Sequence, residues 1–128
     1  MAGFSDYLEA ALLNVSLRNT AFTEVAQPYV ALHSADPGDD GSNELSGNGY
    51  ARVAMSFDAP AAGVCQNSAE VTLGPATGGA WSEATHVSLW DADTAGNCLY
   101  AGELTTAKTV AEDDSAQFAA GALTVTLT

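Results

Sequence analysis

Apolar residues recur at three- and four-residue spacing near the start of the chain. The positions that repeat are Tyr7, Leu8, Ala11, Leu12 and Val15. This period predicts one amphipathic helix over residues 4–18, with Ser5 suited to the N-cap and two carboxylates in the first turn, where the helix dipole favours anions. Phe4 and Leu13 widen the apolar stripe, so the helix needs cover from its own sheet or from another chain.

After Asn19 the spacing of apolar residues shortens to two, which is typical of strands. In residues 50–57, alternate side chains from Ala51 to Phe57 fall on one apolar face. The predicted strands are residues 29–33, 50–57, 64–67, 69–73, 86–91, 98–104, 116–119 and 123–127. Residues 34–49 are rich in turn formers and hold four of the 16 acidic residues, which predicts a long, exposed acidic loop.

Seven or eight short strands separated by Gly, Pro and Asp residues are typical of an all-β fold. We therefore predict a mainly β protein: an antiparallel β-sandwich or barrel over residues 28–128, preceded by the helix. One domain over residues 1–128 is expected at this length, because no repeat or linker divides the chain.

The charge balance restricts the classes of partner. Lys and Arg number 3 against 16 Asp and Glu, so the net charge is −13, and only 15% of residues are charged. Nucleic acids and anionic membranes are excluded as partners because both require clustered cations. The chain also lacks a run of about 18 apolar residues and a cationic leader, so we expect neither a membrane span nor signal-directed export. The neutral surface suits packing against other subunits, or a composition fitted to a salty environment.

The cysteines and histidines are interpreted as structural. Cys65 and Cys98 fall on predicted strands, where a disulfide is conceivable, but without an export signal we expect two thiols. His33 and His86 lack ligand spacing to another His or Cys. Ser88 lies two residues from His86 on one strand face, which is not a converging nucleophile and base. We therefore expect no catalytic residue and no cofactor.

Two acidic segments have some of the residues that a calcium site needs. Residues 91–102 begin like an EF-hand loop, but Ala95 stands at the fifth position and Gly102 where the bidentate glutamate belongs. Residues 35–41 leave an irregular oxygen cage open, although Asp residues beside Pro and Gly are ordinary turn formers. We predict no metal site.

Several side chains are candidates for contact with a partner. Arg52, one of three cations, either pins the 34–49 loop through a carboxylate or reaches a partner subunit. Trp81 lies in a Gly-rich stretch and is either a core aromatic or an exposed anchor. The interface candidates are Phe4, Tyr7, Leu8, Tyr50, Arg52 and Trp81.

Seven stretches form one pattern that spans nearly the whole chain. They are GFSDYLEAALLN (3–14), YVALHSADPGDDG (29–41), ELSGNGYAR (44–52), THVSLWD (85–91) after Trp81, LYAGEL (99–104), KTV (108–110) and FAAGALTVTL (118–127). The pattern resembles a family of short tailed-phage virion proteins, described as tail-fibre-like proteins or as head decoration (cement) proteins. Cys65, Cys98 and the EDD at 112–114 depart from the family pattern.

The resemblance implies a virion structural protein without enzymatic activity or cofactor. We expect a capsid decoration protein that is made in the host cytoplasm, binds the outer surface of the major capsid protein lattice and stabilises the head. A tail or tail-fibre component is one alternative. A carbohydrate-binding host-recognition module, with Trp81 or Tyr50 as its stacking platform, is another. We expect a homotrimer, because closed symmetric assemblies are the default, and apolar assembly of such acidic copies should strengthen with salt.

Overall fold

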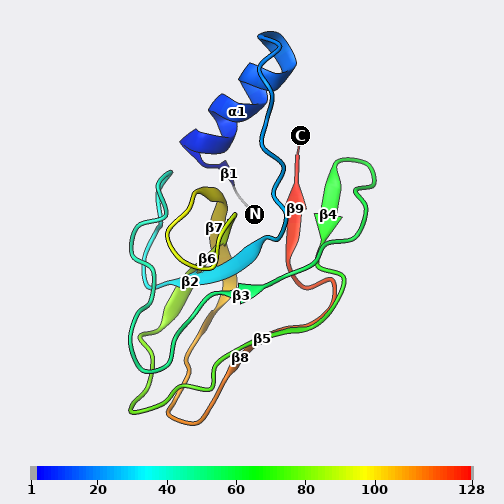
Figure 1. The fold of residues 1–128 in the computed structure, drawn as a ribbon. Coiled ribbons are helices and arrows are strands. Elements are labelled where there is room, and N and C mark those ends of the chain that lie inside the picture. Colours follow the sequence, from blue (N-terminus) through cyan, green and yellow to red (C-terminus); the bar gives the residue numbers. More distant parts are fainter. Residues whose placement is uncertain (1–2, 128) are drawn as a thin grey trace.

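The computed structural model describes residues 3–127 and confirms a mainly β fold with an N-terminal helix (Figure 1). The helix α1 covers Asp6–Leu17, and the strands are β1 (Gly3–Phe4), β2 (Tyr29–His33), β3 (Val53–Ala54), β4 (Val64–Gln66), β5 (Val71–Leu73), β6 (Ala84–Trp90), β7 (Cys98–Lys108), β8 (Ala116–Phe118) and β9 (Thr124–Thr126). Every pair of these strands is antiparallel. The sheets in the described part of the chain do not close into a barrel.

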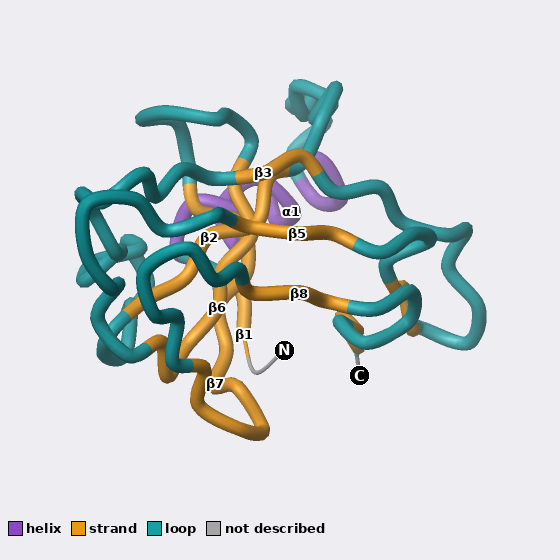
Figure 2. The backbone as a smooth tube through the Cα atoms, turned by 90° about the horizontal axis from the view of Figure 1, so that it is seen from below, coloured by secondary structure: helices purple, strands orange, loops and turns teal. Residues whose placement is uncertain are grey.

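One large sheet, ordered β1-β7-β6-β2-β3, is accompanied by the pairs β4-β9 and β5-β8. In Figure 2, β5 and β8 lie side by side and cross the strands of the large sheet. Val30 and Leu32 of β2 lie opposite Leu89 and Val87 of β6, and these side chains enter the main core with residues of β5, β8 and β9. The core is therefore formed between the large sheet and the two pairs.

The other face of β2 and β6 is covered by irregular chain instead of a second sheet. Ala31 lies opposite Ser88, and Ala31 packs with Trp90 and Cys98 in a second, smaller cluster. Gly41, in the 34–49 loop, lies so close to Trp90 that a Cβ there would collide with the ring, and its φ of +80° favours glycine. The loop thus closes this face of the sheet.

Several element bounds differ from those predicted. The helix begins two residues later than expected, because Phe4 pairs with Tyr100 in β1 and the Ser5 hydroxyl caps the helix by accepting the Leu8 N–H at 3.1 Å. Of residues 50–57, only Val53–Ala54 is a strand, since β3 pairs with two residues of β2 alone. Strand β7 is longer than predicted and reaches Lys108.

Helix α1 contacts the body mainly through its first turns. Leu8 is its one buried residue, while Leu13 and Leu17 are 57% and 77% exposed. The second half of the helix projects beyond the sheets (Figure 1). Within residues 3–127, no helix has the length and apolar character that crossing a bilayer requires.

The two leucines predict different effects on stability. Leu8→Ala should lower the free energy of unfolding by about 2–5 kcal/mol because it empties a buried site. Leu13→Ala, the matched control on the same helix, should change it by less than about 0.5 kcal/mol. Urea unfolding monitored by circular dichroism measures both values. Equal losses in the two variants would contradict the observed packing of α1.

Candidate functional site

A network of buried polar side chains lies under the 34–49 loop. His33 and Ser88 are both 0% exposed. His33 Nδ1 lies 2.7 Å from the Ser42 carbonyl oxygen and must donate to it, because a carbonyl only accepts. His33 Nε2 therefore accepts the Ser88 hydroxyl at 2.6 Å, and Ser88 Oγ in turn accepts the Trp90 indole N–H at 2.7 Å. The polar side-chain atoms of His33, Ser88 and Trp90 therefore all have hydrogen-bond partners.

The contact between Ser88 and His33 has the spacing of a nucleophile and its base. Complete burial prevents a substrate from reaching the hydroxyl, so the pair serves the fold. The spacing in the sequence brings Ser88 near His86, its neighbour on the same strand, and gives no sign of the contact with His33. In the register of β2 and β6, His33 lies opposite His86 and diagonally beside Ser88.

Burial also affects the charge of His33. Loss of solvent lowers the pKa of His33 from its ordinary 6.5, against the opposing effects of the Ser42 hydrogen bond and the Glu44 charge. The neutral imidazole is the form that fits between the Ser42 carbonyl and the Ser88 hydroxyl. Folding is therefore coupled to deprotonation of His33.

Arg52 joins the 34–49 loop to the body. Its Nε and Nη2 donate to the two carboxylate oxygens of Glu44 at 2.9 and 2.8 Å, and its Nη1 donates to the carbonyls of Ala92 and Ala95. The guanidinium carbon lies 3.7 Å from the centre of the Trp90 ring. The prediction that Arg52 pins this loop is confirmed. Its side chain is 7% exposed, which leaves it no reach to a partner subunit.

Glu44 receives a third hydrogen bond from the Tyr50 hydroxyl at 2.9 Å. Burial alone would raise the pKa of Glu44, but the hydrogen bonds from Arg52 and Tyr50 outweigh it and hold the pKa below its usual value. The Tyr50 hydroxyl also accepts the Leu32 N–H at 3.0 Å, and burial raises the pKa of Tyr50. Glu44 is therefore an anion held by donors from the chain around it.

The loop carboxylates are used in turns. Asp36 accepts the Gly38 N–H at 2.9 Å, and Asp40 accepts both the N–H and the hydroxyl of Ser42. Asp91 accepts the backbone and side-chain N–H groups of Asn97. Among residues 3–127, no three His, Cys, Asp or Glu side chains are arranged to hold a metal ion.

Trp81 does not fill the role of an exposed anchor. Its side chain is 6% exposed, its indole N–H donates to the Asn48 carbonyl at 2.8 Å, and its ring packs against Tyr50 in a T-shaped contact. Of the two alternatives that the sequence left open for Trp81, the core aromatic is the one observed, and its backbone N–H donates to the carbonyl of Val110. Trp81 is thus not an open platform for a sugar, and Tyr50 is half-buried against it.

The remaining interface candidates lie together at the α1 end. Phe4 packs edge-on against Tyr100 with 5.4 Å between ring centres. Tyr7 is 38% exposed, and Leu8 faces an apolar groove. The structure thus separates Phe4, Tyr7 and Leu8 from the network around Arg52.

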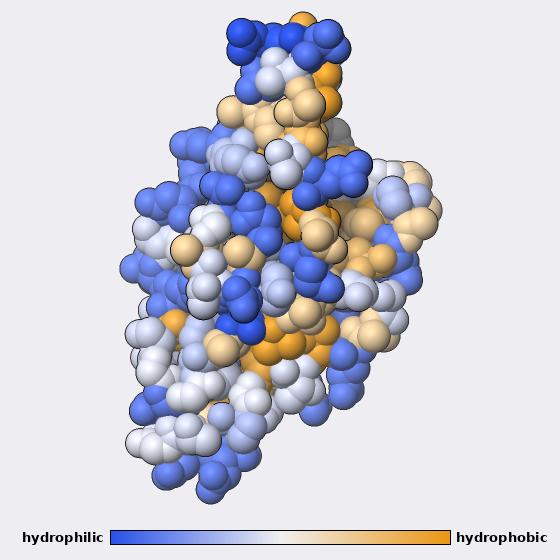
Figure 3. All heavy atoms as spheres, in the orientation of Figure 1, coloured by the Kyte–Doolittle hydropathy of each residue, from blue (hydrophilic) through white to orange (hydrophobic). Residues whose placement is uncertain are grey.

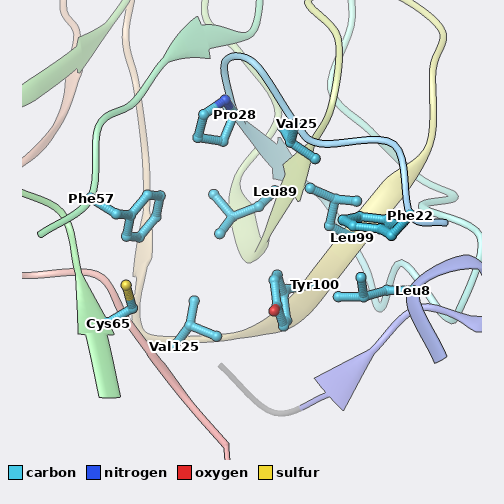
Figure 4. Close-up of a pocket in the computed structure, with 10 residues that line it drawn as sticks. All are labelled: Leu8, Phe22, Val25, Pro28, Phe57, Cys65, Leu89, Leu99, Tyr100 and Val125. Carbon is cyan, nitrogen blue, oxygen red and sulfur yellow. The ribbon is translucent and has the colours of Figure 1, made fainter. Parts of the chain in front are cut away.

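An apolar groove of about 280 Å³ lies between α1, the chain leading into β2, the large sheet and the β4-β9 pair (Figure 4). It is lined by Leu8, Phe22, Val25, Pro28, Phe57, Cys65, Leu89, Leu99, Tyr100 and Val125. The groove could not be predicted from the sequence, because its residues come from seven separate segments. Cys65 borders it as a free thiol, and Cys98, also free, is buried.

The exposed large hydrophobic side chains belong to elements that border this groove. In the described part of the chain they are Tyr7, Leu13, Val15, Leu17, Val64 and Leu127. All of them belong to α1, to β4 or to the residue after β9. Figure 3 shows hydrophobic surface along one side of the helix and over the body beside it. We call α1, the groove and the β4-β9 pair the apolar end.

The fold and the apolar end define a small β module whose distinctive surface is apolar and whose Ser88–His33 pair is buried. Residues 3–126 match the family model described as "Podophage GP4 fiber I protein gp80", and the chain belongs to this family of phage fibre proteins. The resemblance to tail-fibre-like virion proteins is thereby confirmed, and the chain is a phage virion structural protein. A search of curated proteins found no match.

Removal of Arg52 should destabilise the fold strongly. Arg52→Met leaves Glu44 without its cation and two carbonyls without donors, so we expect a loss of about 3–5 kcal/mol in the free energy of unfolding. Arg18→Met, which alters an exposed cation, is the control and should change it by under about 0.5 kcal/mol. In the double variant with Glu44→Gln, the loss should fall short of the sum of the single losses. Additive losses in denaturant unfolding would refute the pairing.

Burial of neutral His33 predicts a loss of stability in mild acid. Its folded pKa lies below 6.5, so the unfolded chain binds the proton first and stability declines as the pH falls below about 6.5. The slope contributed by one proton reaches at most about 1.4 kcal/mol per pH unit. Unfolding measured between pH 7 and 5 should show this slope in the native chain and a shallower one in His33→Gln. Identical slopes would contradict the assignment.

Proposed function

We propose that the chain is a structural subunit of a fibre on the phage virion and has no enzymatic activity. The observation that carries the proposal is the family match over residues 3–126, whose description names a podophage fibre protein. The closed Ser88–His33 pair agrees with it, since the reactive groups serve the fold.

The shape of the module suggests its place within such a fibre. The longest regular elements are a 12-residue helix and an 11-residue strand, and the sequence carries no internal repeat that would build an elongated shaft. A helix of 12 residues is only about 18 Å long. The chain therefore suits a compact knob or attachment unit better than a shaft.

Capsid decoration is the second candidate function. It would place the chain on the outer surface of the head, bound to the major capsid protein. The neutral surface, with 15% charged residues, and the apolar end favour docking on another protein. The net charge of −13 supports neither nucleic acid nor an anionic membrane as the partner. Host recognition through sugar stacking on Trp81 loses its support, because that ring is buried.

Immunogold labelling of purified virions with an antibody against this chain tests the two candidates. Label on fibres is expected from the first, and label spread over the capsid faces would favour decoration instead. Pre-incubation of the antibody with the purified chain is the control and should abolish the label. Absence of the chain from the virion by mass spectrometry, together with unlabelled particles, would overturn both.

A further inference from the structure

We propose that the chain assembles with copies of itself through the apolar end. The second half of α1 of one copy docks in the apolar groove of a neighbouring copy, and its own groove receives the helix of another. The inference goes beyond the proposed function, because it rests on the surface of the chain and not on the family or on the location in the virion.

The exposed leucines of α1 are not covered by the groove of their own chain. Leu8 points into the groove of its own chain. At about 100° of rotation per residue, Leu13 lies about 140° and Leu17 about 180° around the helix from Leu8. These two side chains face away from the groove beside them, and they are 57% and 77% exposed. Their own groove is out of reach, whereas the groove of a neighbour is open to them.

The groove has the character of an acceptor for such a helix. Its lining is apolar, and its volume of about 280 Å³ accommodates several aliphatic side chains. Leu127 is exposed and lies two residues after the lining residue Val125, so it extends the apolar surface along the end of β9. Docking of one apolar helix face in a hydrophobic groove is a recurrent mode of protein recognition.

The distribution of charge favours a second copy as the occupant. Residues 10–17, 59–69 and 115–128 contain no charged side chain, so the apolar end is the place where copies with a net charge of −13 can approach closely. Arg18 follows Leu17 at the tip of the helix and forms no salt bridge within residues 3–127. Glu24 and Asp58 adjoin the lining residues Val25 and Phe57 and are exposed. A docked helix brings Arg18 toward these carboxylates.

A contact between helix and groove joins two different surfaces, and each copy has one of each: a helix to insert and a groove to receive one. Such a contact repeats from copy to copy and closes into a ring where the rotation permits it. A trimer, the assembly expected from the sequence, is one closed ring of this kind. The ring buries the apolar side chains that a single copy exposes.

The mass of the purified full-length chain, measured by light scattering after size exclusion at micromolar concentrations, tests the proposal. The native chain should elute as a multiple of its 13.0 kDa mass. Leu17→Glu on the helix and Leu127→Glu, on the same face as the lining residue Val125, should each reduce it to a monomer, while circular dichroism shows an unchanged fold because both positions are exposed. Thr106→Glu adds the same charge to an exposed position of β7 and should leave the assembly intact.

Mixing the two disrupted variants tests the contact itself. Leu17→Glu retains an intact groove and Leu127→Glu an intact helix, so an equimolar mixture should form a complex of twice the chain mass. A native chain that is monomeric throughout, a Leu17→Glu variant that still assembles, or a mixture without the two-chain complex would each overturn the proposal.

Discussion

The structure depends on the requirement that strands β2 and β6 be buried on both faces. One face packs on β5, β8 and β9 through aliphatic side chains, as in an ordinary two-layer core. The other face is covered by residues 34–49, which form no helix or regular strand and meet β2 at an isolated bridge between His33 and Glu44. Arg52 fixes this loop by holding Glu44 with two hydrogen bonds while stacking on Trp90 and binding the carbonyls of Ala92 and Ala95. One side chain thus joins the loop, the sheet and the turn between β6 and β7.

The small number of cations determines how charge is distributed over the surface of the protein. With three basic residues in the chain and the side chain of one of them buried, the charges that remain on the surface are almost all negative. Like charge keeps copies apart over that surface. The uncharged stretches of α1, β4 and β9 are the exception, and these stretches carry the exposed hydrophobic residues. The negative charges and the exposed hydrophobic residues therefore lie on different parts of the surface, as expected of a protein with one preferred contact region.

Local signals in the sequence predicted those parts of the fold that local physics determines. Ser5 was predicted as the N-cap of the helix, and the structure confirms it. The predicted strand over residues 29–33 has the same bounds as β2, because alternation and flanking turns agree there. Arg52 was linked to the 34–49 loop by its rarity among acids, and this needed no tertiary knowledge. The Ser88–His33 contact and the groove were missed, since both depend on strand register and on segments far apart in the chain.

Trp81 illustrates why exposure is hard to infer from local composition. Glycine and small residues around it indicate a loop, and loops lie on the surface. A loop residue is nevertheless buried when its backbone is bound to a distant segment, as the Trp81 N–H is to the Val110 carbonyl. The reverse holds for Leu13, which the sequence adds to an apolar stripe that needs cover, while the helix extends beyond the body that would cover it. Periodicity thus identifies a face that needs cover, and only the tertiary structure shows that the chain itself does not supply it.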